Sequence, residues 1–180
     1  MQGGGRHSRT RLPHVWPSAT AIMSAVRLAR KTDHAALCGL FVEYCRFYRL
    51  THSRARVARF VGERLRDRPL RTWVAPNPRG AEFPLAGFVQ VYETVSTLAL
   101  ARVWVLNDLY VHEAARNHGT GRALVERVLK EARRSGAARI DLATQPGNRR
   151  ARALYESMGF VRSSGFVGYS LLTRPRAAAP

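Results

Sequence analysis

The sequence predicts a single mixed α/β domain with helices packed around a central sheet. Its 180 residues are enough to bury a core, and 46% of them are apolar, as in ordinary globular proteins. Apolar residues recur at helical spacing in three segments, whereas two long segments between residues 85 and 111 are rich in β-branched and aromatic residues. Helical and extended patterns that alternate along a chain indicate helices packed on a sheet.

The first third of the chain is expected to contain a basic extension, one strand and two helices. Residues 1–22 hold three consecutive glycines, two prolines and three arginines but no acid, so we expect a disordered extension without the apolar core of a secretory signal. Residues 25–30 are expected to form the first strand. Thr32 can cap a helix whose apolar side chains recur as far as Tyr48, and residues 53–67 repeat this pattern more weakly.

The middle of the chain is expected to supply three strands. Residues 71–75 read as a short strand, which ends at the turn-forming sequence Pro-Asn-Pro-Arg-Gly at 76–80. Residues 85–95 and 98–111 read as the long strands of a hairpin with Thr97 between them.

The last third is expected to contain two helices and two or three strands. Gly136 and Gly159 follow helical patterns at positions where glycine commonly ends a helix. The expected elements are a helix at 121–135, a buried strand at 139–144, a short helix at 149–158, one or two strands at 160–173 and a flexible tail at 174–180. The folded domain is therefore predicted to span residues 23–173.

The chain is strongly basic. Its 30 Lys and Arg residues against 12 Asp and Glu residues give a formal charge of +18, which attracts anionic partners. All but two of the basic residues are Arg, and this skew follows from codon composition as readily as from nucleic-acid binding. Nucleic acid therefore stays an open partner.

Several function classes are excluded by composition. No apolar run approaches the roughly 20 residues that a membrane helix needs, so no membrane association is expected. The six histidines lack metal-ligand spacing, and no metal is implied. Cys38 and Cys45 are seven residues apart in one expected helix, too far to form a disulfide. Buried thiols in a reducing compartment are the expected state, which predicts a cytoplasmic protein.

The most informative segment is the turn Arg116-Asn117-His118-Gly119-Thr120-Gly121, which opens the third helix. Its two glycines allow successive backbone N–H groups to converge on one point. The following helix adds its unpaired N–H groups and the positive end of its dipole. With Arg116 and Arg122 on either side, this turn is suited to a pyrophosphate.

Other glycine motifs fit less well. A Rossmann fingerprint needs a third glycine where Leu124 stands, and a P-loop needs Gly-Lys followed by Ser or Thr, which is absent. From spacing alone, a plain structural turn remains an alternative.

The neighbouring residues resemble the GNAT superfamily of N-acetyltransferases. The pattern Arg-x-x-Gly-x-Gly-Arg-Ala-Leu at 116–124 follows Asp-Leu-Tyr-Val at 108–111 at the family's spacing. Asn-x-x-Ala-x-x-Leu-Tyr-x-x-x-Gly-Phe at 148–160 is similar to the family's last motif. The resemblance covers about 25–172, is strongest over 104–161, and looks closest to polyamine and small-amine acetyltransferases.

The resemblance implies a mostly antiparallel, twisted sheet that is splayed between its fourth and fifth strands and flanked by about four helices. It also implies acetyl-CoA as cosubstrate. The pantetheine arm would lie beside Leu109, Tyr110 and Val111, and Asn148 would hydrogen-bond it near the thioester. The residues implied at the pyrophosphate are Arg116, Asn117, His118, Gly119, Thr120, Gly121 and Arg122.

The resemblance implies one catalytic candidate, and the need to deprotonate the acceptor amine suggests two more. Tyr155 lies seven residues after Asn148, the family spacing for the acid that protonates the leaving thiolate, although an aromatic anchor for its helix is the alternative. Glu93 and Asp108 are candidate bases for the acceptor amine, because adjacent strands could point both into one cleft. One residue of register would send either side chain to the opposite face.

The predicted function is therefore transfer of acetyl to a primary amine of a small molecule or peptide, by direct attack in a ternary complex. The buried cysteines disfavour an acyl-cysteine route. A homodimer is open by analogy. One alternative is acetylation of a protein N-terminus, a ribosomal protein or aminoacyl-tRNA, and another is a non-catalytic module that binds acyl-CoA or RNA.

Overall fold

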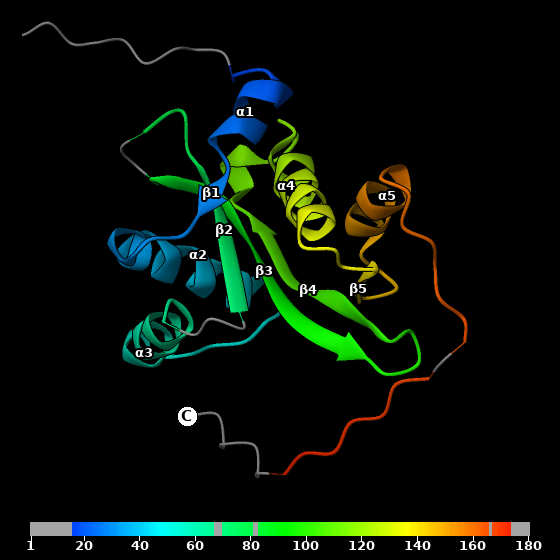
Figure 1. Ribbon diagram of the computed structural model, residues 1–180. Helices are drawn as coiled ribbons and strands as arrows, with labels where there is room; N and C mark the ends of the chain where they lie inside the picture. The colour runs from blue at the N-terminus through cyan, green and yellow to red at the C-terminus, as the bar shows by residue number, and fades with distance from the viewer. Residues whose placement is uncertain (1–15, 67–69, 81–82, 166, 174–180) are drawn as a thin grey trace, which may run out of the picture. The chain divides into compact units, whose positions relative to one another are not determined.

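The computed structural model describes residues 16–66, 70–80, 83–165 and 167–173 (Figure 1). The chain divides into two compact units, Met1–Ala143 and Thr144–Pro180. The first unit contains the sheet and four α-helices, and the second contains one α-helix and the segment that follows it. No helix in these described residues is long and apolar enough to cross a membrane.

A five-stranded sheet forms the centre of the first unit, with the strands in chain order from edge to edge. β1, β2, β3 and β4 pair in antiparallel fashion in that order, whereas β5 runs parallel to β4. This confirms the prediction of a mixed fold around a mostly antiparallel sheet. The strands are β1 (Arg27–Leu28), β2 (Leu70–Pro76), β3 (Leu85–Ser96), β4 (Ala101–Val111) and β5 (Arg139–Leu142).

Two of the expected strands differ in detail. The turn between β3 and β4 is longer than the single residue Thr97, because Leu100 adopts a left-handed backbone and β4 begins at Ala101. β5 was expected to be buried, but residues 139 and 141 are exposed and residues 140 and 142 are half-buried. An edge strand has a partner on one side only, which leaves its charged residues in contact with solvent.

Helices cover both faces of the sheet in the first unit (Figure 1). α2 (His34–Phe47) and α3 (Arg54–Arg64) pack together on one face, and α4 (Thr120–Arg134) packs with α1 (Ala19–Ala25) on the other. Alternation along β3 separates the two faces: Phe88 packs with α2, whereas a Cβ on Gly87 would meet Leu124 of α4 at 3.3 Å. The core beside α2 contains Leu37, Leu40, Phe41, Val57, Val61, Val74, Leu85, Phe88 and Tyr110.

α1 corrects the expectation of a structureless extension up to residue 22. The Ser18 hydroxyl accepts a hydrogen bond from the Ala21 N–H, which caps the helix, and Ile22 is buried. The glycines and prolines of residues 1–22 all precede Ser18, and residues 19–25, which form α1, contain neither. Residues 1–15 lie outside the described residues, so the rest of that prediction is not tested.

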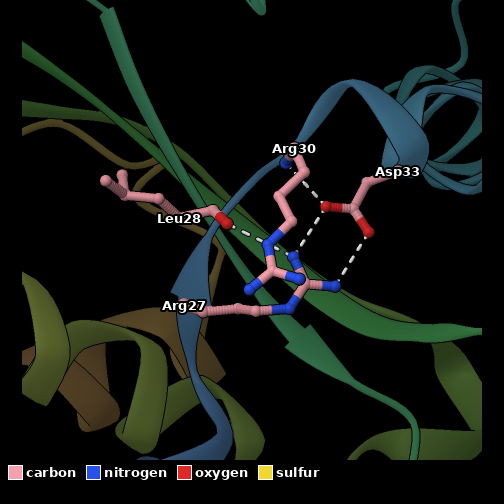
Figure 2. Close-up of polar contacts among 4 residues, drawn as sticks. All are labelled: Arg27, Leu28, Arg30 and Asp33. Carbon is pink, nitrogen blue, oxygen red and sulfur yellow. Dashed lines mark hydrogen bonds and ion pairs between the residues drawn. The ribbon is translucent and has the colours of Figure 1, made fainter.

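A partly buried ion pair joins β1 to the start of α2 (Figure 2). The Arg27 guanidinium donates to both carboxylate oxygens of Asp33, at 2.7 and 2.9 Å, and the Arg30 N–H donates to the same carboxylate at 2.7 Å. Asp33, rather than the expected Thr32, therefore occupies the N-cap position of α2. The hydrogen bond from Arg27 lowers the pKa of Asp33 below its ordinary value.

The second unit contains α5 (Arg149–Ser157), close to the expected helix at 149–158. Gly159 has a φ of 89°, the left-handed conformation that ends helices, as predicted. The predicted final strands are wrong for the described residues, because residues 160–165 and 167–173 include no strand. Val161, Val167, Tyr169, Leu171 and Leu172 are exposed, and an extended segment forms a strand only when another strand pairs with it.

Candidate active site

The C-terminal half of β4 has an edge that no strand of the described residues covers. β5 pairs with β4 from Val103 opposite Arg139 to Leu106 opposite Leu142. β4 continues to Val111, so residues 107–111 extend beyond the end of β5 (Figure 1). This is the splay that the resemblance implies. Backbone N–H and C=O groups along such an edge can pair with an extended ligand.

The chain then curls from β4 into α4 through two left-handed residues. Asn117 has a φ of 67° and Gly119 a φ of 83°, and α4 begins at the next residue, Thr120. Glycine adopts this conformation without steric cost, and Asn tolerates it better than most residues. The first N–H groups of an α-helix have no partner within the helix and lie at the positive end of its dipole. The turn is therefore a candidate anion site.

Two side chains brace this turn from within the protein. The Arg116 Nε donates to the Val111 carbonyl at 3.0 Å, and the guanidinium lies over the Tyr110 ring, 5.7 Å from its centroid. The buried Thr120 hydroxyl donates to the Ala115 carbonyl at 3.3 Å. Arg116 and Thr120 thus hold the two ends of the turn, and their contact with a pyrophosphate stays a prediction.

On the α2 face, β4 contributes to a group of polar and aromatic side chains. The Tyr44 hydroxyl donates to Asp108 Oδ1 at 2.7 Å, and the Tyr110 hydroxyl donates to Glu43 Oε2 at 3.3 Å. His112 Nε2 lies 3.4 Å from Glu43 Oε1. We call these five residues, Glu43, Tyr44, Asp108, Tyr110 and His112, the acidic-aromatic cluster.

Burial sets the protonation state of the phenols in this cluster. Burial, followed by the charge of Asp108, raises the pKa of Tyr44 far above its ordinary value. Burial, followed by the charge of Glu43, raises the pKa of Tyr110. Both phenols therefore stay neutral hydrogen-bond donors, and the two carboxylates give the cluster negative charge.

Glu93 does not join this cluster, so the expectation that it shares one cleft with Asp108 is wrong. Asp108 lies opposite Gln90 in the register and contacts Tyr44 of α2. Glu93 is three residues beyond Gln90 on β3, which places it on the opposite face. There it forms an ion pair with Arg71, whose guanidinium lies over Trp104.

The second unit carries the other two predicted site residues. The Asn148 side-chain oxygen accepts from the Ala151 N–H at 3.2 Å and caps α5. Tyr155 is buried, and its ring lies edge-on to Phe160 at 5.7 Å. These contacts agree with a structural role for both side chains and leave their catalytic roles as predictions.

Sequence reasoning missed His112, which lies just after the predicted strand at 98–111. His112 caps the short 3-10 helix η2 (Glu113–Ala115) by accepting the Ala114 N–H at 3.2 Å, while its other ring nitrogen faces Glu43. The alternate positions of Asp108, Tyr110 and His112 could have indicated it, since alternate residues of a strand share a face.

The described residues offer neither a metal site nor an activated thiol. They include no group of three or more His, Cys, Asp or Glu that could hold a metal ion. Cys38 and Cys45 are half-buried rather than fully buried, and burial raises the pKa of both thiols. A raised pKa reduces the thiolate that an acyl-cysteine route requires.

Comparisons with known proteins identify the family. Residues 34–160 match the acetyltransferase (GNAT) family. The chain is 36% identical over 146 residues to the uncharacterized N-acetyltransferase YhfO of Bacillus subtilis, covering 81% of this chain and 95% of that protein. A crystal structure of a probable acetyltransferase is 33% identical, with a TM-score of 0.75, and covers 83% of this chain and 97% of that one.

A more distant structure shares the fold. It is an aminoglycoside N-acetyltransferase in complex with CoA, 18% identical with a TM-score of 0.64, covering 81% of this chain and 93% of that one. The family match includes both β4 and the turn into α4, which are the parts of the first unit described above. The chain therefore belongs to the GNAT family and is an acetyltransferase.

Proposed function

We propose that this enzyme transfers acetyl from acetyl-CoA to a primary amine of a small molecule or peptide, by direct attack in a ternary complex. The observation that carries the proposal is the uncovered edge of β4, which leads into a left-handed turn at the start of α4. An acetyl-CoA molecule needs both features together, an extended edge for its arm and a polar backbone turn for its diphosphate.

The arm is proposed to pair with the edge of residues 107–111 as an added strand. Leu109, Tyr110 and Val111 would offer backbone groups, because β-augmentation depends on main-chain hydrogen bonds. The diphosphate would then meet the N–H groups from Asn117 to Arg122. The CoA complex of the aminoglycoside N-acetyltransferase supports this ligand class for the fold.

The acidic-aromatic cluster is proposed to receive the acceptor. Its two carboxylates attract an ammonium ion, and the neutral phenols Tyr44 and Tyr110 hold those carboxylates in place. An amine with a pKa of about 10.4 must lose a proton before attack, at a cost of roughly 4–5 kcal/mol at pH 7. Asp108 is proposed to take that proton, directly or through water. Glu93 is not proposed as a base, because it lies on the other face of the sheet.

Bound acetyl-CoA supplies the thioester, whose carbonyl carbon forms the C–N bond while the C–S bond breaks. The β4 backbone N–H would polarise the carbonyl oxygen as negative charge develops on it. Tyr155 is proposed to protonate the departing thiolate, on the strength of its spacing from Asn148 in the last motif. Asn148 is proposed to hydrogen-bond the arm.

A thiol-release assay with purified protein, acetyl-CoA and a panel of amines tests this function. The panel contains polyamines, amino acids, aminoglycosides, peptides and aminoacyl-tRNA, and we expect release with at least one small primary amine. Tyr155→Phe should lower kcat by about 10²-fold or more without changing acetyl-CoA affinity. Tyr169→Phe is the matched control, since Tyr169 is 92% exposed in the same unit. Equal rates for wild type and Tyr155→Phe would end the acid role.

A second candidate acceptor is a protein N-terminus, a ribosomal protein or aminoacyl-tRNA. The formal charge of +18 favours it, because such substrates are polyanions or are bound to them. Thiol release from acetyl-CoA with tRNA or ribosomal substrates, but not with free amines, would favour this second class of acceptor. A homodimer and a cytoplasmic location stay predictions.

A further inference from the structure

The segment before α1 contacts the turn that we propose binds the diphosphate. The Trp16 indole stacks on the His118 ring with centroids 4.5 Å apart and an interplanar angle of 12°. The Arg79 guanidinium lies 5.1 Å from the centroid of the same indole. Trp16 therefore joins the N-terminal segment, the β2–β3 connection and the turn.

This contact involves the most constrained part of the turn. His118 stands between Asn117 and Gly119, both of which have left-handed backbones. A left-handed non-glycine residue is disfavoured and persists only where surrounding contacts hold it. Within the turn itself, Arg116 and Thr120 anchor the two ends. Stacking on Trp16 anchors its middle.

Trp16 also lies outside the residues that match the family. The family match begins at residue 34, whereas Trp16 precedes α1. α1 is held against α4, with Ile22 buried, so the segment that carries Trp16 is itself fixed beside the start of α4. The support for the turn thus comes from a segment outside the family match.

We infer that Trp16 is a positioning residue for donor binding, which holds His118 and so keeps the turn's backbone N–H groups directed at the diphosphate of acetyl-CoA. The inference rests on the proposed function. Trp16 acts through His118 and does not touch the reacting atoms. Its removal weakens binding of the diphosphate and leaves the acceptor and the chemical step unaffected.

Two acetyl donors test this role. Acetyl-CoA carries the diphosphate, and S-acetyl-pantetheine does not. Trp16→Ala should raise KM for acetyl-CoA by about two- to tenfold, the range that one aromatic stack supports, with kcat and acceptor KM unchanged. KM for S-acetyl-pantetheine should stay at the wild-type value. Trp16→Phe, which keeps a stacking ring, should restore most of the affinity, and Thr20→Ala, an exposed change on α1, is the control.

The outcomes separate the possible failures. If wild type binds both donors equally well, the proposed role of the turn is wrong. If wild type prefers acetyl-CoA and Trp16→Ala keeps that preference in full, only the inference about Trp16 is overturned. Equal losses on both donors, accompanied by a lower Tm, would also overturn it, because they indicate a purely structural residue.

Fluorescence gives a readout that does not depend on activity. The chain has three tryptophans, and Trp73 and Trp104 are 1% and 0% exposed, so acrylamide should quench mainly the half-buried Trp16. Acetyl-CoA should protect this emission as the turn becomes ordered around the diphosphate, and Trp16→Phe should lack the quenchable component. Unchanged quenching at saturating acetyl-CoA would contradict the inference.

Discussion

The proposed role of Asp108 as the base depends on the residues that contact its carboxylate. It accepts hydrogen bonds from Tyr44 at 2.7 Å and from the Asn107 side chain at 2.6 Å. Tyr44 cannot take up the acceptor's proton, because it already holds its own, and its raised pKa keeps it protonated. The carboxylate is therefore the group in this pair that can accept a proton.

Replacing Asp108 by Asn tests that role, since the change removes the charge and keeps the size. Asp108→Asn should lower kcat/KM for the acceptor by about 10²-fold, within the usual effect of losing a general base, with acetyl-CoA affinity unchanged. Steady-state kinetics with saturating acetyl-CoA measure this. Asp141→Asn removes a carboxylate that is half exposed on β5 and should leave the acceptor kinetics at wild-type values. Wild-type kinetics for Asp108→Asn would rule out its role as base.

For individual residues, the sequence identified the candidate bases but not the face of the sheet on which each side chain lies. It marked both Glu93 and Asp108 as candidate bases. A register shift between β3 and β4 at Gln90 and Val91 changes which residues lie opposite one another, and no spacing in the sequence indicates it. His112 was missed because it lies one residue past the end of the predicted strand, although it continues the alternation of Asp108 and Tyr110.

Among the elements, the entry into α2 depends on one carboxylate. Asp33→Ala would leave the Arg27 guanidinium and the Arg30 N–H without their shared acceptor. We expect the free energy of unfolding to fall by about 1–3 kcal/mol, as for other charged hydrogen bonds. Asp141→Ala, which breaks an exposed pair, should cost about 0.5 kcal/mol or less. Urea unfolding of both variants measures the difference, and equal small effects would show that the Arg27–Asp33 pair adds nothing to stability.

The same pair has a defined pH dependence. The folded pKa of Asp33 is lower than its unfolded value of about 3.9, so the unfolded chain binds the proton more readily. The stabilisation is complete above that unfolded value and is lost as the pH falls through the folded pKa. Asp33→Ala should therefore unfold with a weaker dependence on pH below about 4 than wild type.

Gly87 connects three elements at the end of the sheet that leads into the turn. A Cβ there would lie 2.6 Å from the Tyr110 carbonyl oxygen and 3.2 Å from the Val111 Cα, both backbone atoms of β4. Gly87→Ala should therefore displace β4 and destabilise the protein by about 1–3 kcal/mol. Gly39→Ala in α2 meets nothing within 4 Å and should stabilise by about 0.5–1 kcal/mol. Thermal unfolding that places Gly87→Ala at or above wild type would contradict this packing.

Helices and strands were predictable where the spacing of apolar residues matches the way the segment packs in the fold. The spacing of apolar residues located α2, α3 and α4 within a few residues, and Gly136 and Gly159 have the left-handed backbones that end helices. α1 was missed because the prolines and glycines before Ser18 dominated the composition of residues 1–22. The described residues of 160–173 include none of the expected strands. Alternating apolar and polar residues suit a strand but do not supply the partner strand that it must pair with.

For the whole molecule, the proposed function depends on two features that lie next to each other along the chain. β4 extends past β5 and offers a backbone edge, and the turn that follows it opens α4 with two left-handed residues. The family match supports acetyl transfer for the chain in general terms. In the proposed function, the acceptor depends on side chains of α2 and β4, which the backbone arrangement does not determine.

The most direct test of this account is the affinity for acetyl-CoA of two glycine variants, measured by calorimetry. Gly119 and Gly136 flank α4 at its two ends, with φ values of 83° and 72°, so alanine strains both positions by a similar amount, about 1–2 kcal/mol. Only Gly119 lies in the proposed diphosphate turn. We predict that Gly119→Ala weakens acetyl-CoA binding by about tenfold or more, while Gly136→Ala binds as wild type does. Equal affinity for both variants, or no binding of acetyl-CoA to wild type, would contradict the account.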